Sequence, residues 1–317
     1  MIEYTAVIRT LGKAGEKYQR LLNSLIVQTC KPKAIIVYIA DGYPIPKETV
    51  GIETYIYVKK GMVAQRALPY NEVETEFILF LDDDVELPKD GVSHLYRQLV
   101  DNKADVISPD VFHNAKRDWK SKILMFLSGR MLARTDDGVW GYKVMRNGGY
   151  SYNDNPSKGV LFSQTNAGPC FLCRKSDFIS INFENELWLD KVQYALGDDQ
   201  VMFYKMYKKG LKVLTSYDSG IEHLDAGTTM ISSNKQKTLI FSDFRFKTIF
   251  WFRFIFMPEK SLLLKCWDVI CLGYTFLFAL FISFVKGEFD VLRLKWNAIK
   301  DGIAFINSND YKTLPRI

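Results

Sequence analysis

The sequence has few of the residues that mark disulfide-rich, zinc-binding or secreted proteins. It has five irregularly spaced cysteines, and Cys170 and Cys173 form one C-x-x-C pair without a second pair or histidines at metal spacing. We therefore expect these two to be small core residues. The chain opens with MIEYTAVIRT, an amphipathic strand pattern instead of a charged segment followed by an apolar one. No secretory signal is expected, and a reducing cytosol is the default compartment.

Internal repeats, low-complexity tracts and a dispersed basic charge are also lacking. The net charge is +6, but residues 235–317 hold 13 Lys and Arg against 7 Asp and Glu, so the first 234 residues are balanced. We predict no nucleic-acid partner. The 317 residues, 48% of them hydrophobic, suffice for one large domain with an appendage.

Short apolar runs alternate with helical patterns through the first half of the chain. YTAVIRT, AIIVYIAD, TYIYV and FILFLDDD have strand patterns, and EKYQRLLNSLIVQ, MVAQRAL and GVSHLYRQLVDN have helical ones. This alternation predicts an α/β fold with a mostly parallel central sheet. Ligands bind such sheets outside the carboxyl ends of the strands, where Asp41 and the aspartates 82–84 fall.

The second half is less regular. Periodicity weakens over residues 113–158, which indicates a functional or mobile insertion. GPCFLCRKSDF then predicts a strand entering a helix, and Asp198 and Asp199 begin an apolar-periodic helix that Gly210 ends. Long aromatic-rich helical stretches follow. We predict a catalytic domain over residues 1–234 and a separate helical segment over residues 235–317.

Three consecutive aspartates, Asp82, Asp83 and Asp84, directly follow the apolar run FILFL. Adjacent carboxylates repel one another, and a buried ionised carboxylate is costly unless a cation or hydrogen-bond donors compensate it. A solvated turn at the strand end is the alternative. We favour a compensating cation, because no turn residue separates the three charges from the strand.

An ordered set of motifs over about the first 225 residues resembles the family 2 nucleotide-sugar glycosyltransferases of the GT-A fold, a Rossmann-like nucleotide-diphospho-sugar transferase fold. AVIRT resembles the family's first strand, IADG its nucleobase-binding turn, and KKGMVAQRAL its Gly-x-x-x-Ala-Arg helix start. FLDDD resembles its Asp-x-Asp motif, GDDQVMFYKMYKKG its acidic pair before a helix, and IEHLDAGTT its late histidine. Each motif alone is weak, but their order is a strong signal.

The resemblance implies a nucleoside-diphosphate-sugar donor whose leaving diphosphate is neutralised by Mn²⁺ or Mg²⁺. It assigns the metal to Asp84 and His223, and it implies that Asp82 faces the ribose or contacts the metal through water. It assigns donor binding to Thr10, Asp41, Arg66, Asp82 and Asp83. The alternatives are a turn-forming role for Asp41, a surface helix position for Arg66 and a structural role for His223.

The pair before the late helix is assigned to catalysis. An acceptor hydroxyl needs a positioned carboxylate to remove its proton, and the resemblance implies one in-line, inverting displacement. Asp199 aligns with the family's base, but Asp198 stands where the family has Glu, so either aspartate remains a candidate. A helix N-cap is the alternative for this pair. Six aromatic residues are candidates for stacking on sugars or for core packing: Trp119, Trp140, Tyr142, Tyr150, Tyr152 and Trp188.

The predicted function is sugar transfer to a glycan or lipid-linked acceptor in surface polysaccharide assembly, by an inverting, metal-dependent hexosyltransferase-type enzyme. A sugar nucleotidyltransferase is the first alternative, but it would need a Gly-rich loop after the first strand, where only Gly12 and Gly15 are loosely placed. A non-catalytic membrane-associated binding module is the second, and it would not need two acidic sites.

The C-terminal segment predicts a location. VICLGYTFLFALFISFV, residues 269–285, is uncharged but short for a bilayer core, which needs about 20 residues. Both flanks carry Lys and Arg, and a single span would leave one basic flank on the outer side. We therefore expect helices lying in the headgroup layer of a peripheral or monotopic protein, on the cytoplasmic face of the cell membrane. A buried core helix is the alternative.

Overall fold

A computed structural model of the chain describes residues 2–111, 118–129, 139–192, 194–224 and 233–316. Its centre is a ten-stranded sheet in the order β3-β2-β1-β4-β10-β6-β11-β9-β7-β8, and β12 pairs with β5 in a second, two-stranded sheet. The strands are β1 (Tyr4–Thr10), β2 (Ala34–Ala40), β3 (Glu53–Val58), β4 (Phe77–Asp82), β5 (Val85–Glu86), β6 (Val106–Pro109), β7 (Trp140–Val144), β8 (Tyr150–Tyr152), β9 (Val160–Ser163), β10 (Cys170–Arg174), β11 (Val213–Ser216) and β12 (Glu222–His223).

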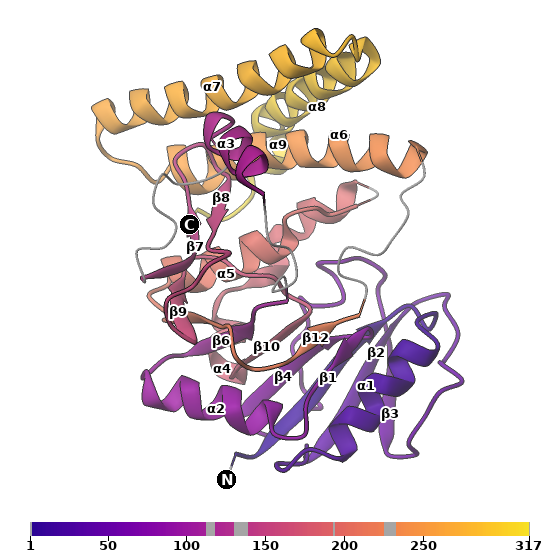
Figure 1. Cartoon of the computed structure of the whole chain (residues 1–317). Helices are drawn as coiled ribbons and strands as arrows, with labels where there is room; N and C mark the ends of the chain where they lie inside the picture. The colour runs from indigo at the N-terminus through magenta and orange to yellow at the C-terminus, as the bar shows by residue number, and fades with distance from the viewer. Residues whose placement is uncertain (1, 112–117, 130–138, 193, 225–232, 317) are drawn as a thin grey trace.

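Helices lie on both faces of the sheet and gather beyond one end of it (Figure 1). They are α1 (Glu16–Ile26), α2 (Gly91–Asp101), α3 (Trp119–Leu127), α4 (Lys175–Ser180), the 3₁₀ helix η1 (Phe183–Lys191), α5 (Asp198–Lys208), α6 (Ser233–Phe250), the π-helix η2 (Trp251–Phe256), α7 (Leu262–Val285), α8 (Phe289–Asn307) and α9 (Asn309–Lys312). The predicted mixed α/β architecture is confirmed.

The strands β3, β2, β1 and β4 are parallel to one another, whereas β10 pairs antiparallel with both β4 and β6. Alternate residues face opposite cores: Val7 and Phe80 pack on one side of the sheet, Ile8 and Leu81 on the other. Burial on both faces explains why these strands are nearly continuous apolar runs. Parallel pairing brings Arg9 of β1 into register with Asp82 of β4 at their carboxyl ends.

The predicted core role of Cys170 and Cys173 is confirmed, because both are fully buried in β10 with free thiols. They belong to different cores, one on each face of the sheet. Successive side chains of a strand point to opposite faces, so two residues that are three positions apart lie on different faces of the sheet.

One local prediction was wrong. Residues 61–67 form consecutive turns instead of a helix, because Pro69 follows too soon for a helix to propagate. The weakly periodic insertion contains a helix, α3, whose first turn is capped where Asp118 Oδ1 accepts a hydrogen bond from Ser121 N at 2.8 Å. Residues 112–117 and 130–138 of the insertion lie outside the described residues.

The C-terminal segment, predicted to be separate, shares a hydrophobic core with the first 234 residues. Phe250 of α6, Phe254 of η2 and Phe305 of α8 belong to the same core as Trp188 and Phe203 of the first 234 residues. These long aromatic side chains reach onto α5 and η1 and make one continuous core. The composition shift near residue 235 therefore marks no boundary in packing.

A buried charge cluster joins this C-terminal segment to the sheet domain. Glu186 of η1 is completely buried and accepts hydrogen bonds from Lys205 Nζ at 2.9 Å, Arg253 Nη2 at 2.9 Å and Trp188 Nε1 at 2.6 Å. Burial alone would raise the pKa of Glu186, but Lys205 and Arg253 outweigh it and lower that pKa. Three helices, η1, α5 and η2, are thereby held at one point.

Helix α7 is different, because it is long and apolar enough to cross a membrane yet only 17% of its most apolar window is buried. It is the one such helix among the described residues. Most of the surface of α7 is therefore not buried in the protein, which contradicts the alternative of a buried core helix.

We expect Glu186→Gln to lower the free energy of unfolding by about 3–5 kcal/mol, because Lys205 and Arg253 would stay buried without a negative partner. Urea unfolding followed by tryptophan fluorescence measures the change. Glu184→Gln is the matched control on the same helix; it lies at the surface, and we expect it to change stability by less than about 0.5 kcal/mol. Equal effects of the two substitutions would contradict the role of Glu186.

Candidate functional site

The acidic triplet lies where β4 ends. Asp82 is the last residue of β4, Asp83 and Asp84 form a turn, and β5 then pairs antiparallel with β12. Leu224 N donates to Asp84 O at 2.8 Å across this small sheet. His223 is thereby held with Nε2 only 3.0 Å from Asp84 Oδ2. The structure brings together two residues that the sequence analysis assigned to one metal, although they are far apart in the chain.

Asp83 contacts Thr10 at the end of β1. Its carboxylate accepts a hydrogen bond from Thr10 Oγ1, and Thr10 Oγ1 accepts one from Gly12 N at 2.8 Å. Burial and the neighbouring Asp84 and Asp82 raise the pKa of Asp83 to about 6, although Thr10 opposes this shift. Thr10 and Asp83, both predicted to bind the donor, thus form one wall of the site.

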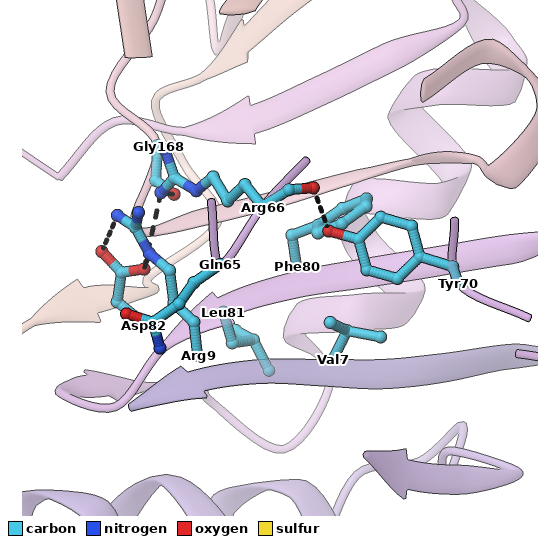
Figure 2. A pocket seen from close by; sticks show the side chains of 9 residues that line it. All are labelled: Val7, Arg9, Gln65, Arg66, Tyr70, Phe80, Leu81, Asp82 and Gly168. Atoms are coloured by element: carbon cyan, nitrogen blue, oxygen red, sulfur yellow. Dashed lines mark hydrogen bonds and ion pairs between the residues drawn. The ribbon is translucent and has the colours of Figure 1, made fainter. Parts of the chain in front are cut away.

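Asp82 is compensated by two arginines of the chain itself (Figure 2). Arg9 makes two hydrogen bonds to the Asp82 carboxylate, the one from Nη2 to Oδ2 being 3.0 Å long. Arg66 Nη2 lies 3.4 Å from Asp82 Oδ1. Burial alone would raise the pKa of Asp82, but Arg9 and Arg66 outweigh it and lower that pKa. The positive charge that was expected beside Asp82 is therefore supplied by the guanidinium groups of Arg9 and Arg66.

Arg66 also joins the acidic pair of α5. It is only 3% exposed, its Nη1 contacts Asp199 Oδ1 and lies 3.3 Å from Asp198 Oδ2, and its Nη2 donates to Gly168 O at 2.5 Å. The predicted alternative of a surface helix residue is wrong for Arg66. An added Cβ at Gly168 would lie 2.1 Å from Asp199 Oδ1. Only glycine therefore lets the backbone come this close to the ion pair.

The two aspartates of α5 differ in environment. Asp198 is buried, with Arg9 Nη1 3.5 Å from its Oδ2, whereas 31% of the Asp199 side chain is exposed. Burial first, and then the Asp199 charge, raise the pKa of Asp198 to about 7. Asp199 Oδ2 accepts a hydrogen bond from Gly168 N at 3.0 Å. One carboxylate is therefore enclosed, and the other is fixed in orientation but accessible.

Neither aspartate caps the helix. The N-cap of α5 is Gly197, in a left-handed conformation with φ 89°, and it makes no side-chain cap hydrogen bond. Asp198 and Asp199 occupy the first turn and direct their side chains to the arginines. The N-cap alternative for this pair is therefore wrong.

A cavity of about 840 Å³ opens on this edge of the sheet, a volume typical of small-molecule sites. Its walls include the triplet and His223 on one side and Arg9, Lys13 and Lys60 on another. Tyr43 also lines the cavity, and the Nζ atoms of Lys13 and Lys60 lie 4.8 and 4.9 Å from its ring centre. The cavity combines acidic groups, flexible cations and one aromatic face.

Asp41 stands beside this cavity but is not part of its lining. It is exposed in a turn closed by a hydrogen bond from Tyr43 N to Ala40 O at 3.1 Å, with Gly42 at φ 82°. The turn-forming role considered for Asp41 is confirmed. Its assignment to nucleobase binding stays a prediction.

Sequence reasoning missed Arg9 and Asp190. Arg9 is the one charged residue in the strand YTAVIRT, and a charge inside a buried strand was the available signal. Asp190 of η1 accepts hydrogen bonds from Val63 N at 3.1 Å and Ala64 N at 2.9 Å. It thereby holds the turns that carry Arg66, and no local pattern indicated this contact.

The aromatic candidates separate into two groups. Tyr142, Tyr152 and Trp188 are buried, and Trp188 belongs to the core. Trp119 and Tyr150 are exposed, and Trp140 lines a second cavity of about 520 Å³ with Phe162 and Tyr207. Only this second group remains available for stacking on a ligand.

The chemistry of the pair Asp84 and His223 fits a divalent ion. One carboxylate and one imidazole are ligands that Mn²⁺ accepts, and both line the cavity. The described residues contain no group of three or more potential metal ligands. A two-ligand site suits an ion that shares its coordination with phosphate oxygens and water.

Comparison with known proteins supports a glycosyltransferase. Residues 4–108 match the sequence model of the glycosyl transferase family 64 domain. That match supports the enzyme class, and the predicted membership of family 2 stays a prediction. No curated protein matches this chain by sequence.

Solved structures show the fold. GalNAc-T7 with UDP, GalNAc and Mn²⁺ superposes with a TM-score of 0.50 at 13% identity, over 86% of this chain and 54% of that one. The mannosyltransferase PcManGT from Pyrobaculum calidifontis, in complex with GDP-Man and Mn²⁺, gives 0.50 at 11% identity, over 98% of this chain and 82% of that one. This chain thus spans about half the length of GalNAc-T7. The predicted GT-A-like fold is confirmed.

The raised pKa of Asp198 predicts a pH dependence of stability. Between its ordinary value of 3.8 and about 7, the folded protein binds this proton more tightly than the unfolded chain does. Stability contributed by Asp198 therefore falls as pH rises through this range. We expect Asp198→Asn to flatten the slope of unfolding free energy against pH, measured by urea unfolding. The exposed Asp101→Asn is the control, and an unchanged slope in Asp198→Asn would contradict the assignment.

Proposed function

We propose that this protein is an inverting, metal-dependent glycosyltransferase that moves a sugar from a nucleoside-diphosphate-sugar to a glycan or lipid-linked acceptor, in surface polysaccharide assembly. The observation that carries the proposal is the pair Asp84 and His223, which lines the large cavity at the carboxyl edge of the sheet. The arginine-linked aspartates Asp82, Asp198 and Asp199 lie directly beside it. The family match over the first strands supports the same class.

The cavity suits a donor that carries a diphosphate. Arg9, Lys13 and Lys60 supply positive charge to its walls, and the Tyr43 ring offers a flat face to a base or ribose. Asp84 and His223 would hold Mn²⁺ or Mg²⁺. The ion, when bound, would stabilise the negative charge that develops on the leaving diphosphate. Thr10 fixes the orientation of Asp83 at the same wall.

The accessible carboxylate is the better candidate for the base. A general base must come within hydrogen-bond reach of the acceptor hydroxyl. The Asp199 side chain is partly exposed, whereas that of Asp198 is buried. Arg66 and Gly168 N orient its two oxygens, and each oxygen keeps a lone pair for the incoming proton. Asp198, with a pKa of about 7, would instead tune the charge around Arg9 and Arg66.

The direct test is donor hydrolysis. UDP-, GDP- and dTDP-sugars are incubated with the protein and Mn²⁺ or Mg²⁺, and released nucleoside diphosphate is measured over hours. Slow metal-dependent release from one donor class supports the proposal. Tight donor binding with no release of nucleoside diphosphate, even when acceptor mixtures are added, would favour a binding module. Release of pyrophosphate from a nucleoside triphosphate and a sugar phosphate would favour a nucleotidyltransferase.

For the metal, we expect Asp84→Ala to lose metal-dependent donor binding while the fold survives, because the ion would lose its carboxylate ligand. Calorimetry of donor binding with and without Mn²⁺ measures this, and circular dichroism checks the fold. Asp101→Ala, at the surface end of α2, is the control. Parent-like, Mn²⁺-dependent binding by Asp84→Ala would remove Asp84 from the metal site.

For the base, we expect Asp199→Asn to slow transfer by roughly 10²-fold or more, because the amide cannot accept the proton. Donor affinity should barely change, since the side chain keeps its shape. Turnover and calorimetric donor affinity are measured for Asp199→Asn and Asp198→Asn in parallel. Parent turnover in Asp199→Asn, with loss in Asp198→Asn, would transfer the role to Asp198.

A further inference from the structure

Helix α7 has two chemically different faces. The side chains that face the protein recur at spacings of three and four, and they include Asp268, Thr275, Phe276 and Ser283. The opposite face is exposed and contains no charge; its residues are Leu263, Trp267, Ile270, Tyr274, Leu277, Phe281 and Phe284. Such spacing places each set on one side of a helix. The apolar stripe is therefore directed outward over the full length of α7.

Helix α3 extends this stripe from a distant part of the chain. Tyr274 Oη of α7 donates to Leu127 O at 2.5 Å, and Asn147 Nδ2 joins Gly129 O at 2.6 Å to Thr275 Oγ1 at 2.8 Å. Figure 1 shows α3 beside α7, on the side of the molecule away from α1 and β3. The exposed apolar residues of α3 are Trp119, Ile123, Leu124, Phe126 and Leu127. We call the exposed apolar residues of α3 and α7 together the α3–α7 platform.

The inward face fixes how α7 can meet a lipid bilayer. Asp268 is completely buried, and its Oδ1 accepts a hydrogen bond from Arg146 Nη1 at 2.8 Å. On the same face Lys295 of α8 donates to Ser283 Oγ at 2.8 Å. A span would carry these groups into hydrocarbon, where an ionised side chain is costly. Only an orientation with α7 parallel to the membrane keeps its polar contacts and submerges its apolar stripe.

Charge and aromatic placement match a lipid surface. Lys260 and Lys265 stand at one end of α7 and Lys286 at the other, and Lys120 lies next to Trp119 on α3. Lysines around an apolar face suit anionic headgroups, and Trp and Tyr side chains suit the interfacial layer. Contiguous exposed apolar surface of this kind marks an interaction site.

We propose that the α3–α7 platform docks, parallel to the membrane, on the anionic cytoplasmic face of a lipid bilayer. The inference goes beyond sugar transfer, because it depends only on surface chemistry and not on the donor site. Both helices enter the lipid interface together. Since α6, η2 and α8 share the main core, docking fixes the orientation of the whole catalytic domain.

Vesicle co-sedimentation of the full chain tests the proposal, with vesicles of phosphatidylcholine alone and of phosphatidylcholine with phosphatidylglycerol. We expect binding to the anionic vesicles, reduced by high salt. Leu277→Glu with Phe281→Glu on α7, and Ile123→Glu with Leu124→Glu on α3, should each lower vesicle affinity by at least about tenfold. Ile52→Glu is the matched control: Ile52 is 61% exposed, like Phe281 at 59%, but lies beside β3.

The following outcomes would contradict docking of the platform on lipid. Unchanged binding by either double variant overturns the platform, and binding that depends on α7 alone and resists alkaline carbonate would establish a span. Failure of the full chain to bind vesicles, with a concentration-dependent dimer that Phe281→Glu dissociates in analytical ultracentrifugation, would assign the face to a second copy. Donor hydrolysis is measured on every variant; we expect it to match the parent, so loss of docking is separable from loss of the proposed activity.

Discussion

A buried network of two arginines and three aspartates is the constraint on which the site depends. Arg9 and Arg66 compensate Asp82, Asp198 and Asp199, and these residues come from β1, the 61–67 turns, β4 and the start of α5. Charges of one sign could not remain there together, because each would be desolvated beside a like charge. The network therefore fixes where four distant parts of the chain meet.

The network also divides the site into two parts. Arginines satisfy the inner aspartates, which leaves Asp84 and His223 at the cavity as the groups whose chemistry suits a metal. Asp190 accepts hydrogen bonds from Val63 N and Ala64 N, and it thereby fixes the turns that position Arg66. The orientation of the candidate base thus rests on residues that need not touch a substrate.

A second buried charge cluster, centred on Glu186, connects helix α5 of the site to the C-terminal helices. Glu186 joins Lys205 of α5, the helix that begins with Asp198, to Arg253 of η2. Phe276 of α7, the helix proposed to dock on lipid, packs with Phe244 of α6 and with residues of α8 in a smaller cluster. Helices α6 and α8 also contribute to the core that holds Phe203 of α5, the helix that carries the candidate base. This coupling is a matter of packing, and it explains why residues 235–317 do not form a separate unit.

The sequence alone predicted the strands β1 to β4 and β10, the mixed α/β class and the acidic edge. Buried parallel strands are continuous apolar runs, and the polar end of β4 is visible as Asp82–Asp84. The sequence also determined that Asp198 and Asp199 begin a helix, and that residues 269–285 are apolar. Only the tertiary structure decided that Arg9 neutralises Asp82, that Asp198 and Asp199 differ in burial, and that α3 lies against α7. These outcomes depend on contacts between distant parts of the chain, such as Arg9 with Asp82, 73 residues apart, and Tyr274 with Leu127, 147 residues apart. Local propensity carries no information about such contacts.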